Sequence, residues 1–206
     1  MRSKEKSANI YFLRHGQTDF PLDRIYCDDR EDPQLNANGI YQAKCAAVSL
    51  KNANISKIYA SPAKRTQMTA KELSEVTNLP VETLPEWIER RFGIWEGLYF
   101  NEIEEQFPDE YLNWKKDNVG FTPEGGETIN DLRQRLSGSL KSLIEAHRGE
   151  NIAIVTHVGP IRVSLCESLA TPIENYRQIR VDYAAISRVD YGETRNNLIK
   201  VNYCSY

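Results

Sequence analysis

Two of the three histidines in this 206-residue sequence stand where a buried strand is expected to end. His15 follows Arg14 directly after the apolar run 10–13, and His157 directly follows the apolar run 152–156. An adjacent arginine repels cations, which disfavours a metal site at His15. Guanidinium groups instead pair with phosphate oxygens, and their charge keeps a nearby imidazole unprotonated. A neutral imidazole held among arginines can attack phosphorus.

A second arginine occupies a position suited to the same chemistry. Arg65 follows Ser61 and Pro62, a cap and proline pair that predicts a helix start. At the first turns of that helix, Arg65 could clamp one phosphoryl group together with Arg14. His147, the third histidine, falls at the end of a predicted long helix, where a helix-terminus role is expected.

Apolar runs and helical periodicities alternate along the chain, and they predict the elements that position these residues. Strands are expected at 10–13, 57–60, 81–84 and 152–156, with a closing pair at 184–191 and 197–204. Helices are expected from Asn36 to about residue 50, from Ser61 to about 76, from 129 to Gly149, and from about 158 to 170. An aromatic-rich insertion at 99–118 is predicted to form two short helices broken at Pro108.

This alternation predicts an α/β fold, layered α/β/α, around a mostly parallel central sheet. We expect a single domain over residues 1–206, with a helical insertion at about 99–125 forming a lid over the carboxyl ends of the strands. Ligands of such folds bind beyond those ends. His15 and His157 are therefore expected to meet there.

Composition excludes several other classes of protein. The net charge of −3, from 26 basic and 29 acidic residues, argues against nucleic-acid and membrane-surface partners. No apolar run approaches the ~18 residues that a membrane helix needs, and the start MRSKEKSAN is not typical of a secretory signal. The four widely spaced cysteines, Cys27, Cys45, Cys166 and Cys204, favour reduced thiols in a cytoplasmic protein.

Six blocks, in order, resemble the histidine phosphatase superfamily, the phosphoglycerate mutase-like enzymes. The first is LRHGQT at 13–18. The others are PQLNANGIYQA (33–43), YASPAKRTQMTA (59–70), IERRFGIWEG (88–97), FTPEGGET (121–128) and VTHVGPIR (155–162). One RHG tripeptide is weak support, whereas six ordered blocks spanning about residues 9–190 make a specific resemblance.

The resemblance implies a role for each matched residue. His15 is the expected nucleophile that becomes a phosphohistidine, and Arg14 and Arg65 are expected to hold the phosphoryl oxygens. His157 is expected to donate a hydrogen bond to the same group, stabilising transition-state charge. Glu89 matches the general acid and base. The resemblance implies no metal and no cofactor.

Other motif residues receive weaker assignments. Glu96 fits the family's structural WEG turn, so Glu89 is preferred as the acid. Gln17 is assigned to the substrate pocket, and Thr18 either to that pocket or to satisfying loop backbone groups. Core or interface packing is preferred to a substrate wall for three tryptophans, Trp87, Trp95 and Trp114.

Three functions remain open from the sequence. The preferred one is a phosphomonoesterase acting on a small phosphorylated metabolite, because the WEG and PEGGE blocks resemble the α-ribazole and broad-specificity phosphatase branch. The alternatives are a phosphoglycerate mutase and a non-catalytic phosphoester-binding module. Departures from the family pattern at residues 19–21, Cys27 and Val158 lie beside the pocket and leave the substrate open. The closing strands could pair with another subunit, so a homodimer is possible.

Overall fold

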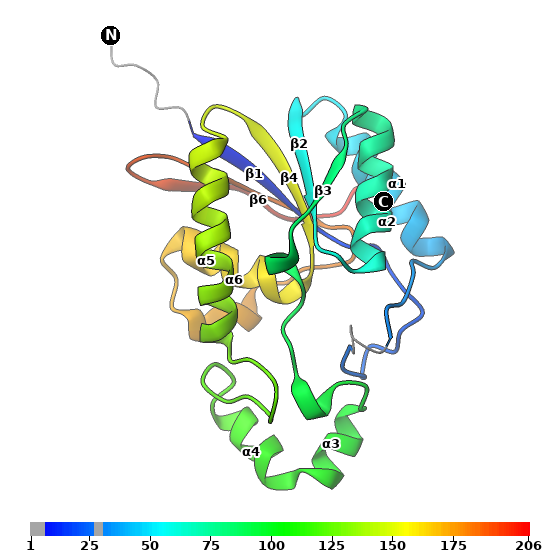
Figure 1. The fold of residues 1–206 in the computed structure, drawn as a ribbon, viewed down its shortest axis with the longest axis vertical. Coiled ribbons are helices and arrows are strands. Elements are labelled where there is room, and N and C mark those ends of the chain that lie inside the picture. Colours follow the sequence, from blue (N-terminus) through cyan, green and yellow to red (C-terminus); the bar gives the residue numbers. More distant parts are fainter. Residues whose placement is uncertain (1–6, 27–30) are drawn as a thin grey trace.

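A six-stranded sheet forms the centre of the computed structural model, which describes residues 7–26 and 31–206 (Figure 1). The strand order is β3-β2-β4-β1-β5-β6. The strands are β1 (Ala8–Arg14), β2 (Ile55–Ala60), β3 (Val81–Thr83), β4 (Asn151–Thr156), β5 (Ile186–Tyr191) and β6 (Asn196–Tyr203). The first four strands in this order pair in parallel, and β5 and β6 add antiparallel pairs. The predicted mostly parallel sheet is confirmed.

Helices cover both faces of this sheet (Figure 1). They are α1 (Ala37–Leu50), α2 (Lys64–Thr77), α3 (Phe100–Gln106), α4 (Pro108–Lys116), α5 (Ile129–Ala146) and α6 (Val158–Leu169). Three short 3₁₀ segments, η1 (Pro85–Trp87), η2 (Gly93–Trp95) and η3 (Ile173–Gln178), lie in the connections. The pair α1 and α2 packs on one face and the pair α5 and α6 on the other, as predicted for an α/β/α fold.

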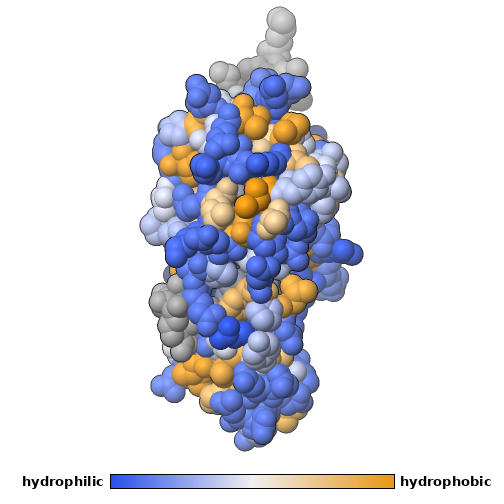
Figure 2. Space-filling model, turned by 90° about the vertical axis from the view of Figure 1, so that its right-hand side faces the viewer, coloured by the Kyte–Doolittle hydropathy of each residue, from blue (hydrophilic) through white to orange (hydrophobic). Residues whose placement is uncertain are grey.

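Strand β1 is apolar at successive positions, without alternating polar residues, because both of its faces are buried. Its residues Ile10 and Phe12 pack in the core beneath α5 and α6, whereas Tyr11 and Leu13 pack in the core beneath α1 and α2. A central parallel strand is buried on both faces and therefore needs apolar residues at successive positions. Hydrophilic residues predominate on the face of the molecule that includes α1 and α2, with apolar residues in small patches (Figure 2).

Two of the predicted helix starts differ in how they form. Asn36 caps α1, accepting a hydrogen bond from the Gly39 backbone nitrogen at 2.8 Å. The second helix was expected to begin at Ser61 and Pro62, but α2 begins at Lys64 with no side-chain cap. This prediction was wrong because the Ser61 hydroxyl is directed to another partner, His157, at 2.7 Å.

The insertion forms the two predicted helices, with Pro108 as the first residue of α4. Helices α3 and α4 lie beyond the carboxyl ends of the parallel strands (Figure 1). They pack around a small apolar cluster of their own, built from Ile25, Trp95, Ile103 and Trp114. This cluster is separate from the two apolar clusters that pack against the faces of the sheet.

Two sequence expectations concern the chain as a whole. Across the described residues, no helix is both long and apolar enough to span a membrane. Cys45, Cys166 and Cys204 are free thiols, as expected, and Cys27 lies outside the described residues.

Candidate active site

The two strand-end histidines meet, as the parallel sheet requires. His15 follows β1 and His157 follows β4, and these strands are neighbours in register, with Arg14 opposite Thr156. The centroids of the two imidazole rings lie 5.4 Å apart. Both residues are buried, with exposed fractions of 2% for His15 and 0% for His157. The sequence prediction that they converge is therefore correct.

Two arginines surround the histidines. Arg65, the second residue of α2, is fully buried and places its Nη2 atom 3.1 Å from Nδ1 of His157. Arg14 donates from Nη1 to the Val181 carbonyl at 2.8 Å, while its buried Nε–H finds no partner among the described residues. A partly buried guanidinium with an unused, buried donor is a strong anion-binding group.

Electrostatics keep both rings neutral. Burial lowers the pKa of His15 well below its ordinary value of 6.5, and the charges of Arg65 and Arg14 lower it further. Burial is also the main cause that lowers the pKa of His157, followed by Arg65 and then by His15. Neutral imidazoles at this edge retain a nitrogen lone pair.

Hydrogen bonds identify which ring nitrogen carries the proton. Nδ1 of His15 lies 2.8 Å from the Gly16 carbonyl, which can only accept, so Nδ1 is protonated and Nε2 holds the lone pair. For His157, Arg65 donates to Nδ1, so Nε2 carries the proton and donates to the Ser61 hydroxyl. The lone pair of neutral His15 therefore lies on Nε2.

The Ser61 hydroxyl gives His157 two usable states. It also lies 2.9 Å from Oγ1 of Thr66, and a hydroxyl can both donate and accept. If Ser61 turns its hydrogen toward Nε2 of His157, the neutral ring carries its proton on Nδ1 instead. In that second state the Nδ1–H faces the Arg65 Nη2 donor 3.1 Å away, so it needs an acceptor that both groups share, as the expected phosphoryl contact would supply.

Glu89 reaches the same region from the segment after η1. Its Oε1 accepts from the Arg90 backbone nitrogen at 2.8 Å and from the Gly159 backbone nitrogen at 3.1 Å. Gly159 is the second residue of α6, so the carboxylate lies at a helix N-terminus, where negative charge is favoured. Glu96, by contrast, accepts from the Phe92 backbone nitrogen at 3.0 Å within its own turn.

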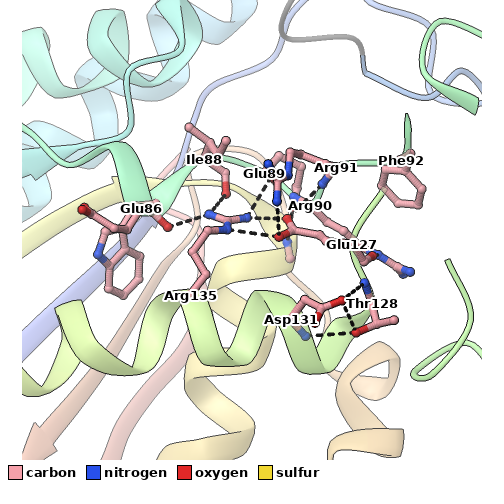
Figure 3. A network of polar contacts seen from close by, with 12 residues as sticks. Glu86, Ile88, Glu89, Arg90, Arg91, Phe92, Glu127, Thr128, Asp131 and Arg135 are labelled. Carbon is pink, nitrogen blue, oxygen red and sulfur yellow. Dashed lines mark hydrogen bonds and ion pairs between the residues drawn. The ribbon is translucent and has the colours of Figure 1, made fainter. Parts of the chain in front are cut away.

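A buried ion pair holds the Glu89 segment in place (Figure 3). Arg135 of α5 donates to the backbone carbonyls of Glu86 at 2.6 Å, Ile88 at 3.2 Å and Glu89 at 3.2 Å. The same guanidinium pairs with Glu127 at 2.5 Å, and Glu127 is only 2% exposed. Arg135 therefore ties the strand-to-insertion connection to α5.

A cavity of about 300 Å³ opens beside these residues. Arg14 and Glu89 line it, together with Tyr26 and Tyr183. The Tyr26 and Tyr183 rings also contact His15, with centroids 6.2 and 5.8 Å from its ring. His15 does not itself line the cavity, but it contacts these two tyrosines, which do. Within the described ranges, no group of three His, Cys, Asp or Glu residues is placed to hold a metal ion.

The weaker sequence assignments fall outside this centre. Gln17 does not line the cavity and accepts a hydrogen bond from Asn38, while Thr18 contacts the Tyr26 hydroxyl at 3.0 Å. His147 ends α5 as expected and contacts the Tyr59 hydroxyl at 2.9 Å. The preferred packing role of three tryptophans is confirmed, since all are core residues, namely Trp87, Trp95 and Trp114.

Five residues of the site were missed by sequence reasoning. Ser61 and Arg162 both stand inside blocks that resemble the family, but their side-chain directions could not be read from spacing. Tyr26, Tyr183 and Arg177 carry no motif signal at all, and only the tertiary contacts bring them to the cavity.

Neutral histidines beside buried arginines, at the carboxyl edge of a parallel sheet, define an α/β protein whose site suits phosphoryl groups. Residues 10–203 match the model of the histidine phosphatase superfamily (branch 1). The chain therefore belongs to that superfamily, as its six motif blocks indicated.

Several similar proteins carry phosphatase names, and one, of Yersinia pestis, is named a probable phosphoglycerate mutase and is 31% identical over 190 residues, covering 90% of this chain and 86% of the relative. Phosphoserine phosphatase 1 of Hydrogenobacter thermophilus is 29% identical over 196 residues, covering 95% of this chain and 92% of the relative. Adenosylcobalamin/alpha-ribazole phosphatase of Escherichia coli is 28% identical over 184 residues, covering 89% and 90%. A solved mycobacterial glucosyl-3-phosphoglycerate phosphatase superposes with a TM-score of 0.85 at 26% identity, over 95% of this chain and 99% of that one. Three mycobacterial relatives, 31% identical over 201 residues, are longer, and the chain spans 55% of their length.

Proposed function

We propose that this protein is a metal-independent phosphomonoesterase that hydrolyses a small phosphorylated metabolite through a phosphohistidine on His15. The observation that carries the proposal is the tautomer of His15. Its Nδ1–H is held by the Gly16 carbonyl, so its Nε2 lone pair is available near the charges of Arg65, which is fully buried, and Arg14, which is partly buried. Phosphatase names among the relatives support hydrolysis as the overall reaction.

The first step transfers the phosphoryl group to the enzyme. Nε2 of His15 attacks phosphorus while the ester P–O bond breaks, and Arg14 and Arg65 neutralise the phosphoryl oxygens. His157, protonated on Nδ1 after the Ser61 hydroxyl turns, donates to the same oxygens. Glu89 takes up one proton as the phosphomonoester binds and gives it to the leaving alkoxide, which departs as the alcohol.

The second step returns the enzyme to its starting state. Glu89, now ionised, takes a proton from a water molecule, and the resulting hydroxide attacks phosphorus. The N–P bond to His15 breaks, inorganic phosphate leaves, and Nε2 regains its lone pair. Atoms and charges balance without a metal or a cofactor.

The arrangement of Arg90 and Arg91 does not favour the mutase alternative. In sequence, two arginines after the catalytic glutamate resemble mutase-like sites. Arg90 here donates to the backbone carbonyls of Glu127 at 2.8 Å and Phe121 at 2.9 Å. Arg91 is exposed and lies 3.6 Å from Glu127, outside the cavity. Both arginines thus support the local fold.

A labelling experiment tests the proposal. The purified protein is mixed with a phosphorus-labelled phosphomonoester and quenched, and the label should stay on the protein in alkali and be lost in acid, as for a phosphohistidine. His15→Ala should abolish the label and reduce phosphate release by at least about a thousandfold. His147→Gln, which removes a histidine remote from the cavity, serves as the matched control. Retained turnover in His15→Ala would refute the mechanism.

The same preparation separates hydrolysis from mutase transfer. Inorganic phosphate release from 3-phosphoglycerate and other phosphomonoesters is compared with formation of 2-phosphoglycerate. We expect phosphate release to dominate, whereas rapid isomerisation with little free phosphate would identify a mutase. Tight binding of phosphoesters without either product would identify a non-catalytic module.

A further inference from the structure

Five arginines line the cavity, which is more positive charge than one phosphoryl group requires. Arg14 lies at the phosphoryl end. Arg24 is already neutralised, because its two terminal nitrogens contact the Glu31 carboxylate at 2.8 Å each. Arg90 is committed to two backbone carbonyls. The remaining two arginines, Arg162 and Arg177, therefore need an explanation.

Neither of these two guanidinium groups has a carboxylate partner within ion-pair distance among the described residues. Arg162, on the second turn of α6, is half-buried and donates from Nε to the Ile179 carbonyl at 2.7 Å. This bond fixes the guanidinium and leaves its two terminal nitrogens for another acceptor. Arg177 of η3 donates from Nε to the Tyr176 hydroxyl at 3.1 Å and stacks 4.4 Å above the Trp114 ring.

These positive charges affect one another. Burial is the main cause that lowers the pKa of Arg162, and the charges of Arg177 and Arg14 lower it further, whereas Glu89 raises it. Like charges that surround a partly buried cavity repel each other less when an anion lies between them. An anionic group bound at Arg162 would therefore be stabilised by several cations at once.

The position of Arg162 relates it to the leaving group. Gly159, whose backbone nitrogen holds Glu89, stands three residues before Arg162 on α6, so both residues face the same side of the helix. Glu89 is the proposed proton donor to the leaving oxygen. A leaving alcohol that extends from Glu89 into the cavity enters a space that Arg162 and Arg177 also line, together with apolar side chains such as Leu22 and Phe100.

We propose that Arg162 and Arg177 form a second anion subsite, and that the natural substrate is a phosphomonoester whose alcohol part carries a carboxylate. This inference rests on the proposed phosphatase function and adds the substrate class. A carboxylate suits the subsite because its two oxygens match the two remaining nitrogens of the Arg162 guanidinium in a planar, bidentate pair. The cavity of about 300 Å³ must also hold the phosphoryl-linked part, which favours a small hydroxy or amino acid.

Matched substrate pairs test the carboxylate directly. O-phosphoserine is compared with O-phosphoethanolamine, and 3-phosphoglycerate with glycerol 3-phosphate, because each pair differs mainly by the carboxylate. We expect kcat/KM to be higher for the acid member by about tenfold or more, the effect of a charge-assisted hydrogen-bonded pair. Equal values for both members, or a preference for the member without a carboxylate, would overturn the proposal.

Two variants locate the effect. In each substrate pair, the value of kcat/KM for the member with the carboxylate is divided by the value for the member without it. Arg162→Gln and Arg177→Gln should each lower this ratio toward one. Arg195→Gln, which removes the same charge from the exposed β5–β6 turn, should leave the ratio unchanged. If Arg162→Gln lowers both members of a pair equally, Arg162 acts on Glu89 or on folding and not on a substrate carboxylate.

A binding measurement separates this proposal from the catalytic one. In the His15→Ala protein, calorimetric titration with O-phosphoserine and O-phosphoethanolamine reports the subsite without turnover. Tighter binding of O-phosphoserine that Arg162→Gln abolishes supports the subsite even if no hydrolysis is found. Equal binding of the two ligands overturns it, even in an active phosphatase.

Discussion

At the scale of single residues, the chemistry of this site depends on where protons reside. His15 and His157 have the same residue type, the same place at a strand end and similar surroundings, yet their tautomers differ. The Gly16 carbonyl holds the proton of His15 on Nδ1, and Ser61 with Arg65 holds that of His157 on Nε2. We therefore expect Ser61 to act as a positioning residue, because its hydroxyl can bond Nε2 of His157 either as the acceptor or as the donor.

Replacing Ser61 by alanine should lower kcat by about tenfold at neutral pH, a typical cost of losing one hydrogen bond that orients a catalytic histidine. Without the hydroxyl donor, the neutral Nδ1–H tautomer of His157 leaves the Nε2 lone pair without a partner. The imidazolium then competes with that tautomer as the donor, so kcat of the variant should rise toward acid pH relative to the parent. The kcat–pH profile measures this change. Ser61→Thr should restore the parent profile, and Ser137→Ala, on the exposed side of α5, is the control. An unchanged profile in Ser61→Ala would contradict the assigned role.

At the scale of elements, the connection from β3 to the insertion decides where Glu89 lies. This segment has no regular helix or strand of its own at Glu89, and other elements hold it. Arg135 of α5 binds three of its carbonyls (Figure 3). The Gly159 nitrogen of α6 binds its carboxylate. Gly93, at the end of this segment, packs closely against the turn that contains Glu124. A Cβ atom at this position would stand 1.9 Å from the Glu124 carbonyl oxygen, and the backbone φ of +52° also favours glycine.

Arg135→Ala should destabilise the protein by about 3 kcal/mol, because it leaves the Glu127 carboxylate buried with only the more distant Arg91 as a cation. We also expect kcat to fall, since the backbone around Glu89 loses three hydrogen bonds. Urea unfolding and steady-state kinetics measure the two effects.

Two further variants test the cause of this destabilisation. The double variant Arg135→Ala/Glu127→Gln should be more stable than Arg135→Ala alone, since it removes the uncompensated charge. Arg133→Ala, on the same helix as Arg135, breaks an exposed pair with Glu167 of α6 and should cost at most about 1 kcal/mol. Equal stabilities of the Arg133 and Arg135 variants would show that the Glu127 pair is unimportant.

At the scale of the whole molecule, the sheet order joins distant parts of the chain into one site. β1 and β4 are neighbours although their facing residues Asn9 and Asn151 are 142 positions apart. The edge strand β6 exposes Ile199, Val201 and Tyr203, with exposed fractions of 53%, 44% and 41%. A homodimer that covers this edge stays a prediction, as does the cytoplasmic location.

The fold holds two histidines in their neutral forms, which links stability to pH. Because their native pKa values lie well below 6.5, the unfolded chain binds more protons than the native one once the pH falls below about 6.5. The free energy of unfolding should therefore be highest above pH 6.5 and should decrease as the pH falls toward the native pKa values. Urea unfolding at pH 7.5 and 5.5 measures this decrease.

His15→Asn should reduce the decrease between those two pH values by about 1.4 kcal/mol, the contribution of one titrating group. His147→Gln, which removes a histidine outside the site, is the comparison. If His15→Asn and the parent protein lose the same free energy of unfolding, His15 is not held neutral by the fold.

Much of the fold could be predicted because many helices and strands depend on patterns of neighbouring residues. The apolar run before His15, the Asn36 cap and Pro108 each act within a few residues, so the sequence predicts β1, α1 and the break between α3 and α4. The start of α2 was misplaced because a long-range contact overrode a local signal. Ser61 has the right type for a cap, but its hydroxyl binds His157, 96 residues away.

The sequence by itself determined which chemistry the site suits and at which strand ends its histidines lie, because residue type and apolar periodicity are local properties. It placed Arg14, His15, Arg65, Glu89 and His157 in motif blocks without any coordinates. Only the tertiary structure decided the tautomers, the tyrosines over His15, and the direction of Arg162 and Arg177 toward the cavity. These depend on side-chain directions and partners that packing selects from distant parts of the chain.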